Sequence, residues 1–167
     1  MRTGPAAGSA AFFLAAPGVV AGLVPYWLTG WRESAPYPVP VRAAGAVMIA
    51  GGGLVLVAAF VRFVREGRGT PAPLAPTDQL VVGGAYRYVR NPMYLAVLTV
   101  IVGQALVLGR PALLLYALAV LAATASFVRW YEEPALRDRY GERYEDYRRA
   151  VPAWRPRLRP WQPPPRR

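Results

Sequence analysis

Residues that could do chemistry are concentrated in two short stretches of an otherwise apolar chain. In residues 78–94 (DQLVVGGAYRYVRNPMY), tyrosines and arginines alternate before an Asn-Pro pair. The second stretch is Arg129 with Glu132 and Glu133, at the end of an apolar run. A guanidinium can bind a carboxylate through two parallel hydrogen bonds, and carboxylates accept hydrogen bonds from hydroxyl and ammonium groups. These stretches therefore indicate a site for a polar ligand. A structural ion pair between Arg129 and Glu133 is the simpler alternative.

Composition excludes several kinds of site. The chain has no cysteine and no histidine, so disulfides, thiolate metal sites and a cysteine nucleophile are excluded. A transition-metal site would have to rest on carboxylates alone, so none is predicted. General-base chemistry falls to Asp, Glu or Tyr. The net charge is +11, and all 20 basic residues are arginine. Because they flank apolar runs, they indicate contact with lipid head groups rather than with nucleic acid.

Four apolar runs must position these stretches: residues 11–29, 41–64, 92–108 and 111–128. Each approaches the roughly 20 apolar residues that cross a bilayer. The sequence thus predicts one all-α integral membrane domain over residues 1–167, with four transmembrane helices. A signal peptide is the alternative for the first run, but no convincing small-residue cleavage site follows it. Only Gly109 and Arg110 separate the last two runs, which predicts a tight antiparallel hairpin that brings the two polar stretches together.

The positions of the arginines predict the topology. Most lie in the loop over residues 65–91 or after residue 128. By the positive-inside rule, this loop and both termini of a multi-pass cell-membrane protein are expected in the cytoplasm. Apolar and tyrosine residues at three- and four-residue spacing predict one amphipathic cytoplasmic helix over residues 134–151. Residues 154–167 are rich in proline and arginine and are predicted to be poorly ordered.

Both polar stretches resemble motifs of the isoprenylcysteine carboxyl methyltransferases and their phospholipid methyltransferase relatives. Residues 84–94 (GAYRYVRNPMY) are similar to the family's G-x-Y-x-x-x-R-H-P-x-Y signature. Residues 132–147 (EEPALRDRYGERYEDY) are similar to its E-E-x-x-L-x-x-x-[FY]-G-x-x-Y-x-x-Y tail. The resemblance covers residues 78–160, about half of the chain. It implies an integral membrane enzyme that transfers a methyl group from S-adenosylmethionine.

The resemblance also implies roles for individual residues. Arg129, with Glu132 beside it, would serve substrate binding and catalysis. Asn91 stands where the family has histidine; it keeps a donor and an acceptor but cannot take up a proton. The residues that would line the cofactor are Asp78, Gln79, Leu80, Val81, Tyr86, Asn91, Pro92, Met93, Tyr94 and Glu132.

The implied acceptor is a membrane-embedded or lipid-anchored molecule, with an isoprenylcysteine-type carboxylate favoured. A carboxylate acceptor needs a cation such as Arg129, whereas the amine of a phospholipid needs a base, which would be Glu132 or Glu133. Two other classes stay open. One is an NADPH-dependent membrane reductase, although no G-x-G-x-x-G motif follows a strand. The other is a non-catalytic membrane module. The oligomeric state is not predicted.

Overall fold

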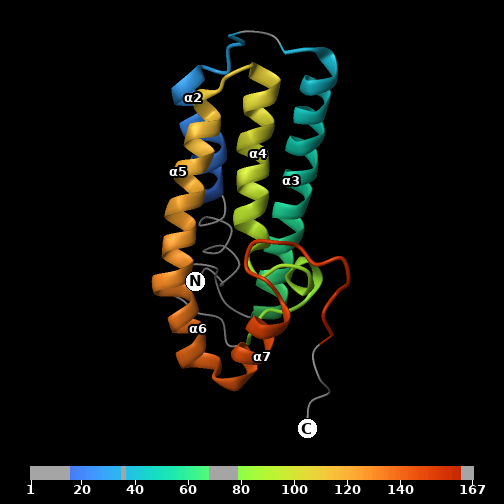
Figure 1. The fold of residues 1–167 in the computed structure, drawn as a ribbon, viewed down its shortest axis with the longest axis vertical. Coiled ribbons are helices and arrows are strands. Elements are labelled where there is room, and N and C mark those ends of the chain that lie inside the picture. The colour runs from blue at the N-terminus through green and yellow to red at the C-terminus, as the bar shows by residue number, and fades with distance from the viewer. Residues whose placement is uncertain (1–15, 35–36, 68–78, 163–167) are drawn as a thin grey trace, which may run out of the picture.

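The computed structural model describes residues 16–34, 37–67 and 79–162. Every regular element in these ranges is a helix, and no strand occurs there. The all-α prediction is confirmed for this part of the chain. Helices α3, α4 and α5 stand side by side along the long axis, and α6 and α7 lie together at one end (Figure 1).

The first helical segment, Ala16–Thr29, contains a π-helical turn, η1 (Val19–Leu23), followed by α2 (Val24–Thr29). Pro25 has no N–H to donate to the carbonyl of Ala21, four residues earlier. The Gln104 side chain satisfies that carbonyl instead, because its Nε2 donates to Ala21 O at 2.7 Å. Its Oε1 accepts a bond of 3.2 Å from Trp31 Nε1. This buried amide therefore fixes the first segment against α4.

Helix α3 (Val39–Gly67) packs closely against α4 (Pro92–Leu108). Glycines make the approach possible, because a Cβ on Gly103 would lie only 2.7 Å from Gly45 O. Gly52 also faces α4, where a Cβ would lie 3.0 Å from Ala96 O, whereas Gly51 faces open space. Helix α4 begins at Pro92, whose missing N–H costs nothing in a first turn. It ends before Gly109 with φ 60°.

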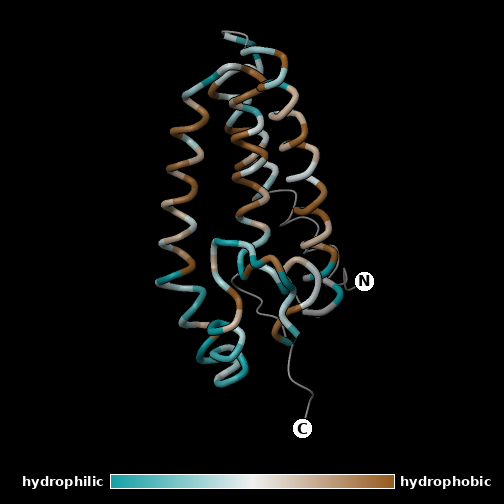
Figure 2. Tube along the Cα trace, turned by 45° about the vertical axis from the view of Figure 1, so that its right-hand side comes forward, coloured by the Kyte–Doolittle hydropathy of each residue, from teal (hydrophilic) through white to brown (hydrophobic). Residues whose placement is uncertain are grey.

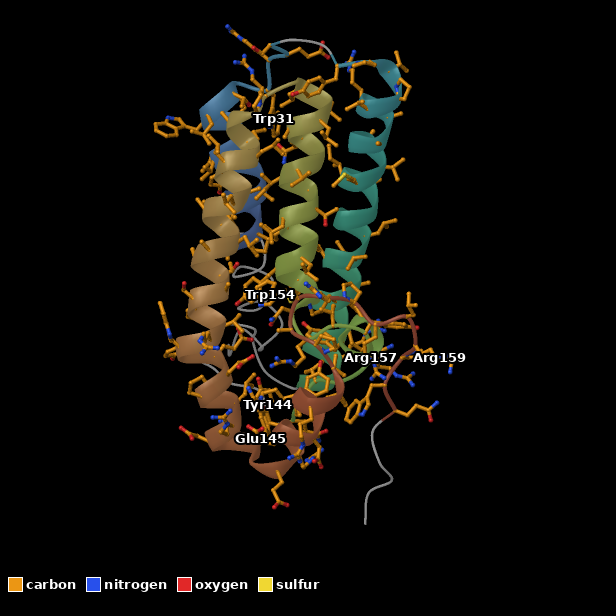
Figure 3. The ribbon with its side chains drawn as sticks, viewed as in Figure 1. Trp31, Tyr144, Glu145, Trp154, Arg157 and Arg159 are labelled. Carbon is orange, nitrogen blue, oxygen red and sulfur yellow. The ribbon has the colours of Figure 1, made fainter. Side chains whose placement is uncertain are left out.

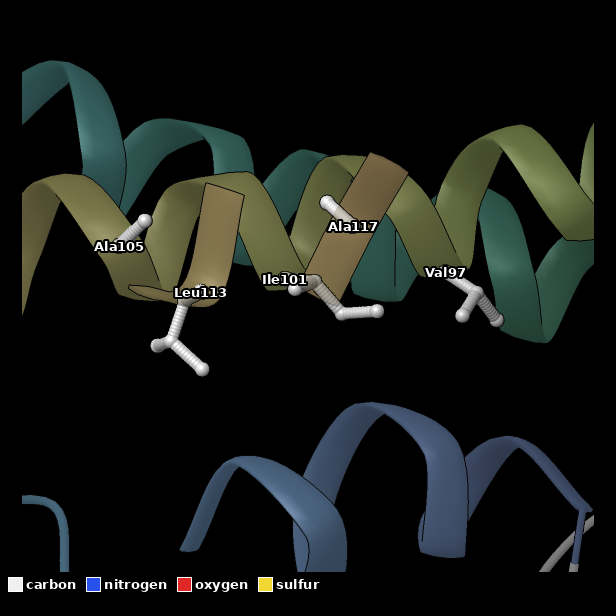
Figure 4. Packing of buried hydrophobic residues seen from close by; sticks show 5 residues of the cluster. All are labelled: Val97, Ile101, Ala105, Leu113 and Ala117. Atoms are coloured by element: carbon white, nitrogen blue, oxygen red, sulfur yellow. The ribbon is translucent and has the colours of Figure 1, made fainter. Parts of the chain in front are cut away.

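Helix α5 (Ala112–Phe127) follows α4 after a short turn and runs back alongside it (Figure 1). The core between them is formed by Val97, Ile101 and Ala105 of α4 with Leu113 and Ala117 of α5 (Figure 4). Val97, Ile101 and Leu113 extend toward the first helical segment, whose Val20 and Ala21 pack against the cluster (Figure 4). Their packing sets the spacing between the start of α4 and the end of α5.

The helix that starts with α5 does not end at residue 128. It passes through a π-helical turn, η3 (Val128–Glu132), into α6 (Glu133–Tyr140), giving an unbroken helix over Ala112–Tyr140. Pro134 explains the wide turn, because a proline ring inside a helix clashes with the carbonyl four residues earlier. The single predicted helix over residues 134–151 is wrong. The chain breaks at Gly141 (φ 55°, ψ −130°), and α7 (Glu142–Ala150) follows.

Two helices, Val39–Arg62 and Ala112–Tyr140, are long and apolar enough to cross a membrane. Ala16–Thr29 and Pro92–Leu108 are apolar but shorter. Hydrophobic positions extend along the upright helices, whereas hydrophilic ones gather at the end that holds α6 and α7 (Figure 2). The protein is therefore membrane-associated. The four predicted spans and the cytoplasmic loop over residues 65–91 stay predictions.

The tail after α7 folds back on the loop before α4. Backbone N–H groups of Arg157 and Trp161 donate to the carbonyls of Tyr88 and Arg87, both at 2.9 Å. Trp161 also packs on Tyr147, with ring centroids 5.4 Å apart. The prediction of a poorly ordered tail is wrong for residues 154–162. Proline lowers the propensity for regular structure, but the loop supplies partners for the backbone of the tail.

Candidate active site

A cavity of about 440 Å³ lies between the start of α4, the end of α5 and the α6–α7 pair. Small-molecule sites typically enclose about 300–1,000 Å³. The first helical segment closes one side of it with Ala16, Pro17 and Val20. Further apolar lining comes from Val97, Val120 and Phe127. The cavity therefore combines a polar end with an apolar wall built from helices of the apolar bundle.

The loop before α4 provides the polar end. A 3₁₀ turn, η2 (Gly84–Arg87), turns Tyr86 inward, where it is buried. The turn begins at Gly84 with φ 56°, a conformation that favours glycine. Asn91, also buried, lies at the N-cap of α4 and lines the cavity with Pro92. The N-terminus of α4, with its free N–H groups, is thus next to the ligand space.

Glu132 is the acid of the cavity. It is carried by the π-helical turn, and the Tyr94 hydroxyl donates to its Oε2 at 3.2 Å. Glu132 forms no ion pair within the described part of the chain. A carboxylate held away from water without a cation is costly, and this cost falls when a cationic ligand binds beside it. The site is therefore arranged to receive positive charge.

Glu133, one residue later, is neutralised by Arg90. Arg90 Nη1 donates to Glu133 Oε1 at 2.6 Å and to the Tyr144 hydroxyl at 2.9 Å. Arg90 Nε donates to Val151 O at 2.9 Å. The two side chains of the ion pair are only 11% and 16% exposed. Arg90 therefore joins the loop, α6, α7 and the tail in one network at the edge of the cavity.

Two tyrosines of α7 complete the polar end. Burial raises the pKa of Tyr144 to about 12. Burial also raises the pKa of Tyr147, whose hydroxyl donates to Tyr86 O at 2.7 Å. Both phenols stay protonated at physiological pH, so they act as hydrogen-bonding groups and not as bases. Tyr144 lies at the end of the molecule that holds α6 and α7, at some distance from Trp31 (Figure 3).

Asn91 is tied to the tail. Its Nδ2 donates to Ala153 O at 3.2 Å, and Trp154 lies near the Tyr94 ring, with centroids 6.3 Å apart. The resemblance implies that Asn91 contacts the cofactor, but its Nδ2 donor is already bonded to the backbone carbonyl of Ala153. The amide of Asn91 takes up no proton, so it does not act as a base in this place.

The structure brings most of the predicted site residues together. Those that line the cavity are Leu80, Val81, Tyr86, Asn91, Pro92, Met93, Tyr94 and Glu132. Gln79 is half-buried beside them but does not line the cavity. Asp78 lies outside the described residues. Arg129, for which a catalytic role was predicted, does not line the cavity. It is exposed and lines a separate hollow.

Sequence reasoning missed the role of Arg90 and the contribution of the first helical segment. Arg90 directly precedes the Asn-Pro pair, and the family motif itself contains that arginine, so the signal was present. The apolar lining residues Pro17 and Val20 carry no comparable signal, because an apolar residue in an apolar helix is expected whether or not it faces a ligand. Arg139 and Tyr131 also line the cavity and were likewise not predicted as site residues.

Fold and site define a helical membrane-associated protein with a partly polar cavity at one end of its apolar helices. The model of the phospholipid methyltransferase family matches residues 41–143, which is well over half of the chain. The chain belongs to this family of methyltransferases, which act on lipids. Comparisons with curated proteins and with solved structures give no significant match. The resemblance found in the sequence is thereby confirmed at the level of the family.

Proposed function

We propose that the protein transfers a methyl group from S-adenosylmethionine to the amine of a lipid head group. The observation that carries this proposal is Glu132, a carboxylate inside the cavity that is bonded by Tyr94 and by no arginine of the described chain. An amine acceptor must lose a proton before its nitrogen can attack, and Glu132 is placed to take it. The family match supports a lipid as the acceptor.

The residues present fit the cofactor. Its ammonium and sulfonium groups are cationic and suit the acid end of the cavity, and its adenine suits the tyrosine rings of the lining, among them Tyr131 and Tyr140. The Glu132 carboxylate can also accept hydrogen bonds from ribose hydroxyls. When bound, S-adenosylmethionine supplies an electrophilic methyl group and leaves as a neutral thioether. The protein's task is to hold the acceptor nitrogen in line with that methyl group.

The cations of the site favour an amine over a carboxylate acceptor. The Arg90 guanidinium is engaged by Glu133, Tyr144 and Val151, which leaves little of it to orient a substrate. Arg129 lines a different hollow. A carboxylate acceptor would meet the negative charge of Glu132 in the same cavity, which opposes its binding.

The isoprenylcysteine-type carboxylate favoured by the sequence remains the competing acceptor. Arg139 lines the cavity and is the residue that would orient such a carboxylate there. Under this alternative Glu132 serves the cofactor and not the acceptor. The two acceptors therefore predict different effects of Glu132→Gln. With an amine acceptor the variant loses the base for proton transfer, whereas with a carboxylate acceptor it loses only a contact to the cofactor.

The apolar wall of the cavity fits the hydrocarbon chains of either acceptor. Val20, Val120 and Phe127 come from helices that have bilayer-facing surfaces, so a lipid head group can reach Glu132 while its chains stay among apolar side chains. This arrangement is consistent with the predicted topology, in which four helices span the cell membrane and both termini and the loop over residues 65–91 lie in the cytoplasm. The topology is part of the proposal.

The experiment compares acceptors. Purified protein in nanodiscs receives S-adenosylmethionine with a labelled methyl group, and either phosphatidylethanolamine or N-acetyl-S-farnesylcysteine. We expect label in the phospholipid, and Glu132→Gln is expected to lower that turnover by about 10²-fold or more, since proton transfer typically contributes about 10²–10⁴-fold. Exposed Glu142 provides the matched control, because Glu142→Gln removes the same charge away from the cavity.

Label in the farnesylated carboxylate alone would overturn the amine acceptor. Calorimetry with S-adenosylmethionine and with NADPH separates the remaining classes. Binding of NADPH alone would favour the membrane reductase, and binding of neither would favour a non-catalytic module. Under the proposal only S-adenosylmethionine or its demethylated product binds.

A further inference from the structure

A second hollow, of about 340 Å³, lies beside the cavity and is formed by η3, α6 and α7. It shares one lining residue, Glu133, with the cavity. The remaining lining consists of three arginines, a tryptophan and a proline: Arg129, Arg137, Arg148, Trp130 and Pro134. The hollow has no part in the methyl transfer described above.

The carboxylates at the hollow are already neutralised. Glu133 is paired with Arg90 at 2.6 Å and lies 3.7 Å from Arg148 Nη1. Glu145 is shared by Arg137 at 2.5 Å and Arg148 at 3.3 Å. The lining of the hollow holds three arginines and one carboxylate, Glu133, so positive charge is in excess there even when the neighbouring Glu145 is counted. The hollow is therefore a site for an anion.

Arg129 is the arginine of the hollow with the fewest contacts to other residues of the described chain. It is exposed and forms no hydrogen bond or ion pair with any residue in the described ranges. Its neighbour Trp130 is 75% exposed, and Tyr131 is exposed as well. Exposed aromatic side chains at the end of an apolar helix are typical of the membrane–water interface. The apolar helix Ala112–Tyr140 changes from apolar to charged residues at this point.

We propose that this hollow binds the phosphate of an anionic phospholipid in the surrounding leaflet, as a lipid site separate from the catalytic cavity. The position at the interface places the arginines at the level of the head groups, where lipid phosphates are found. Guanidinium groups bind phosphate oxygens through paired hydrogen bonds. Trp130 lies against the glycerol and upper acyl region of the same lipid, where an amphipathic ring is favoured.

The site has a structural consequence for the cavity. Glu133 faces both spaces, and Arg148 approaches it from the side of the hollow. A phosphate bound there engages Arg148 and Arg137, and the pairing between Glu133 and Arg90 is then the main contact that remains for this carboxylate. Because Arg137 belongs to α6 and Arg148 to α7, a phosphate that contacts both would bridge the two helices that form one wall of the cavity.

The test is native mass spectrometry of the full chain in a neutral maltoside detergent, titrated with dioleoyl phosphatidylglycerol or dioleoyl phosphatidylcholine. The wild-type protein is expected to retain one phosphatidylglycerol in preference to phosphatidylcholine. Arg129→Gln with Arg137→Gln should reduce this preference by about 10- to 30-fold, since each basic residue near the surface contributes about 1 kcal/mol, and about 1.4 kcal/mol corresponds to tenfold. Arg143→Gln with Arg149→Gln is the matched control, because these exposed residues of α7 do not line the hollow.

Retention of the preference in the control and its loss in the Arg129/Arg137 variant would support the site. An equal loss in both variants would mean general attraction to a basic surface, and would overturn it. Displacement of the lipid by an equimolar amount of inorganic phosphate would show a site for free anions and would overturn the assignment to lipid. No preference in the wild-type protein would also overturn it. The unfolding temperatures of all variants identify any loss of folding. Trp130→Phe is an independent second variant, and it is expected to lower the affinity for phosphatidylglycerol.

Discussion

Replacement of Arg90 by methionine should destabilise the protein far more than removal of an exposed arginine. The variant leaves Glu133 in a place where its side chain is only 16% exposed, without its closest cation. Removing one partner of a buried ion pair typically costs about 3–5 kcal/mol. For a chain of this size, 1 kcal/mol lowers the unfolding temperature by about 2–4 °C, so a fall of about 6–20 °C is expected. Thermal unfolding in nanodiscs, followed by circular dichroism, measures it.

The chain offers a matched control for this prediction. Arg149 and Asp146 form an ion pair with the same N–O distance, 2.6 Å, but their side chains are 71% and 54% exposed. Arg149→Met should therefore cost about 1 kcal/mol or less. Combining Arg90→Met with Glu133→Met should recover at least half of the lost stability, because both buried charges are then gone. Equal shifts for the Arg90 and Arg149 variants, or no recovery in the double variant, would refute the reasoning.

Three further predictions concern the catalytic site, the helix packing and the topology. Tyr94→Phe removes the donor to the cavity carboxylate and should lower turnover about tenfold, corresponding to about 1.4 kcal/mol, in the labelled-methyl assay. Gly103→Ala forces α3 and α4 apart and should cost about 1–3 kcal/mol. Gly51→Ala, whose added Cβ meets no atom within 4 Å, should instead raise the unfolding free energy by up to about 0.5–1 kcal/mol, because alanine is the better helix former. Cysteines introduced at exposed Ser34 and at Leu158, which is 100% exposed, should be labelled by an impermeant maleimide in intact cells only at Ser34. Labelling at Leu158 would contradict the predicted topology.

The sequence predicted the elements whose ends are set by local signals. Helix α4 begins at Pro92 and ends before Gly109, as the apolar run indicated. Helix α5 ends at Phe127, close to the end of the predicted run at residue 128, but the sequence did not predict that the helix continues past the charged residues from Arg129 onward. Charge alone does not break a helix, and the π-helical turn accommodates Pro134, so the helix continues. Gly141 was the signal for the break between α6 and α7, but the regular spacing of tyrosines around it indicated one helix.

The site residues that belong to one contiguous motif could be predicted from the sequence. Ion pairs and hydrogen bonds between residues distant in the sequence could not. Residues 91–94 and Glu132 line one cavity, as the resemblance implied. The alternative considered for Glu133 was an ion pair with Arg129, four residues earlier, but the structure pairs it with Arg90, 43 residues earlier. Likewise, the pairing of the tail with Arg87 and Tyr88 depends on tertiary contacts that no local pattern encodes.

The measurement that tests the central claim most directly is a calorimetric titration of the wild-type protein in nanodiscs with S-adenosylhomocysteine. The account predicts saturable binding at one site. It also predicts that Glu132→Gln weakens this binding, since the variant removes the negative charge that faces the ammonium group of the ligand while keeping the shape of the side chain, whereas Glu142→Gln does not. No heat of binding from a protein that still unfolds cooperatively would contradict the account.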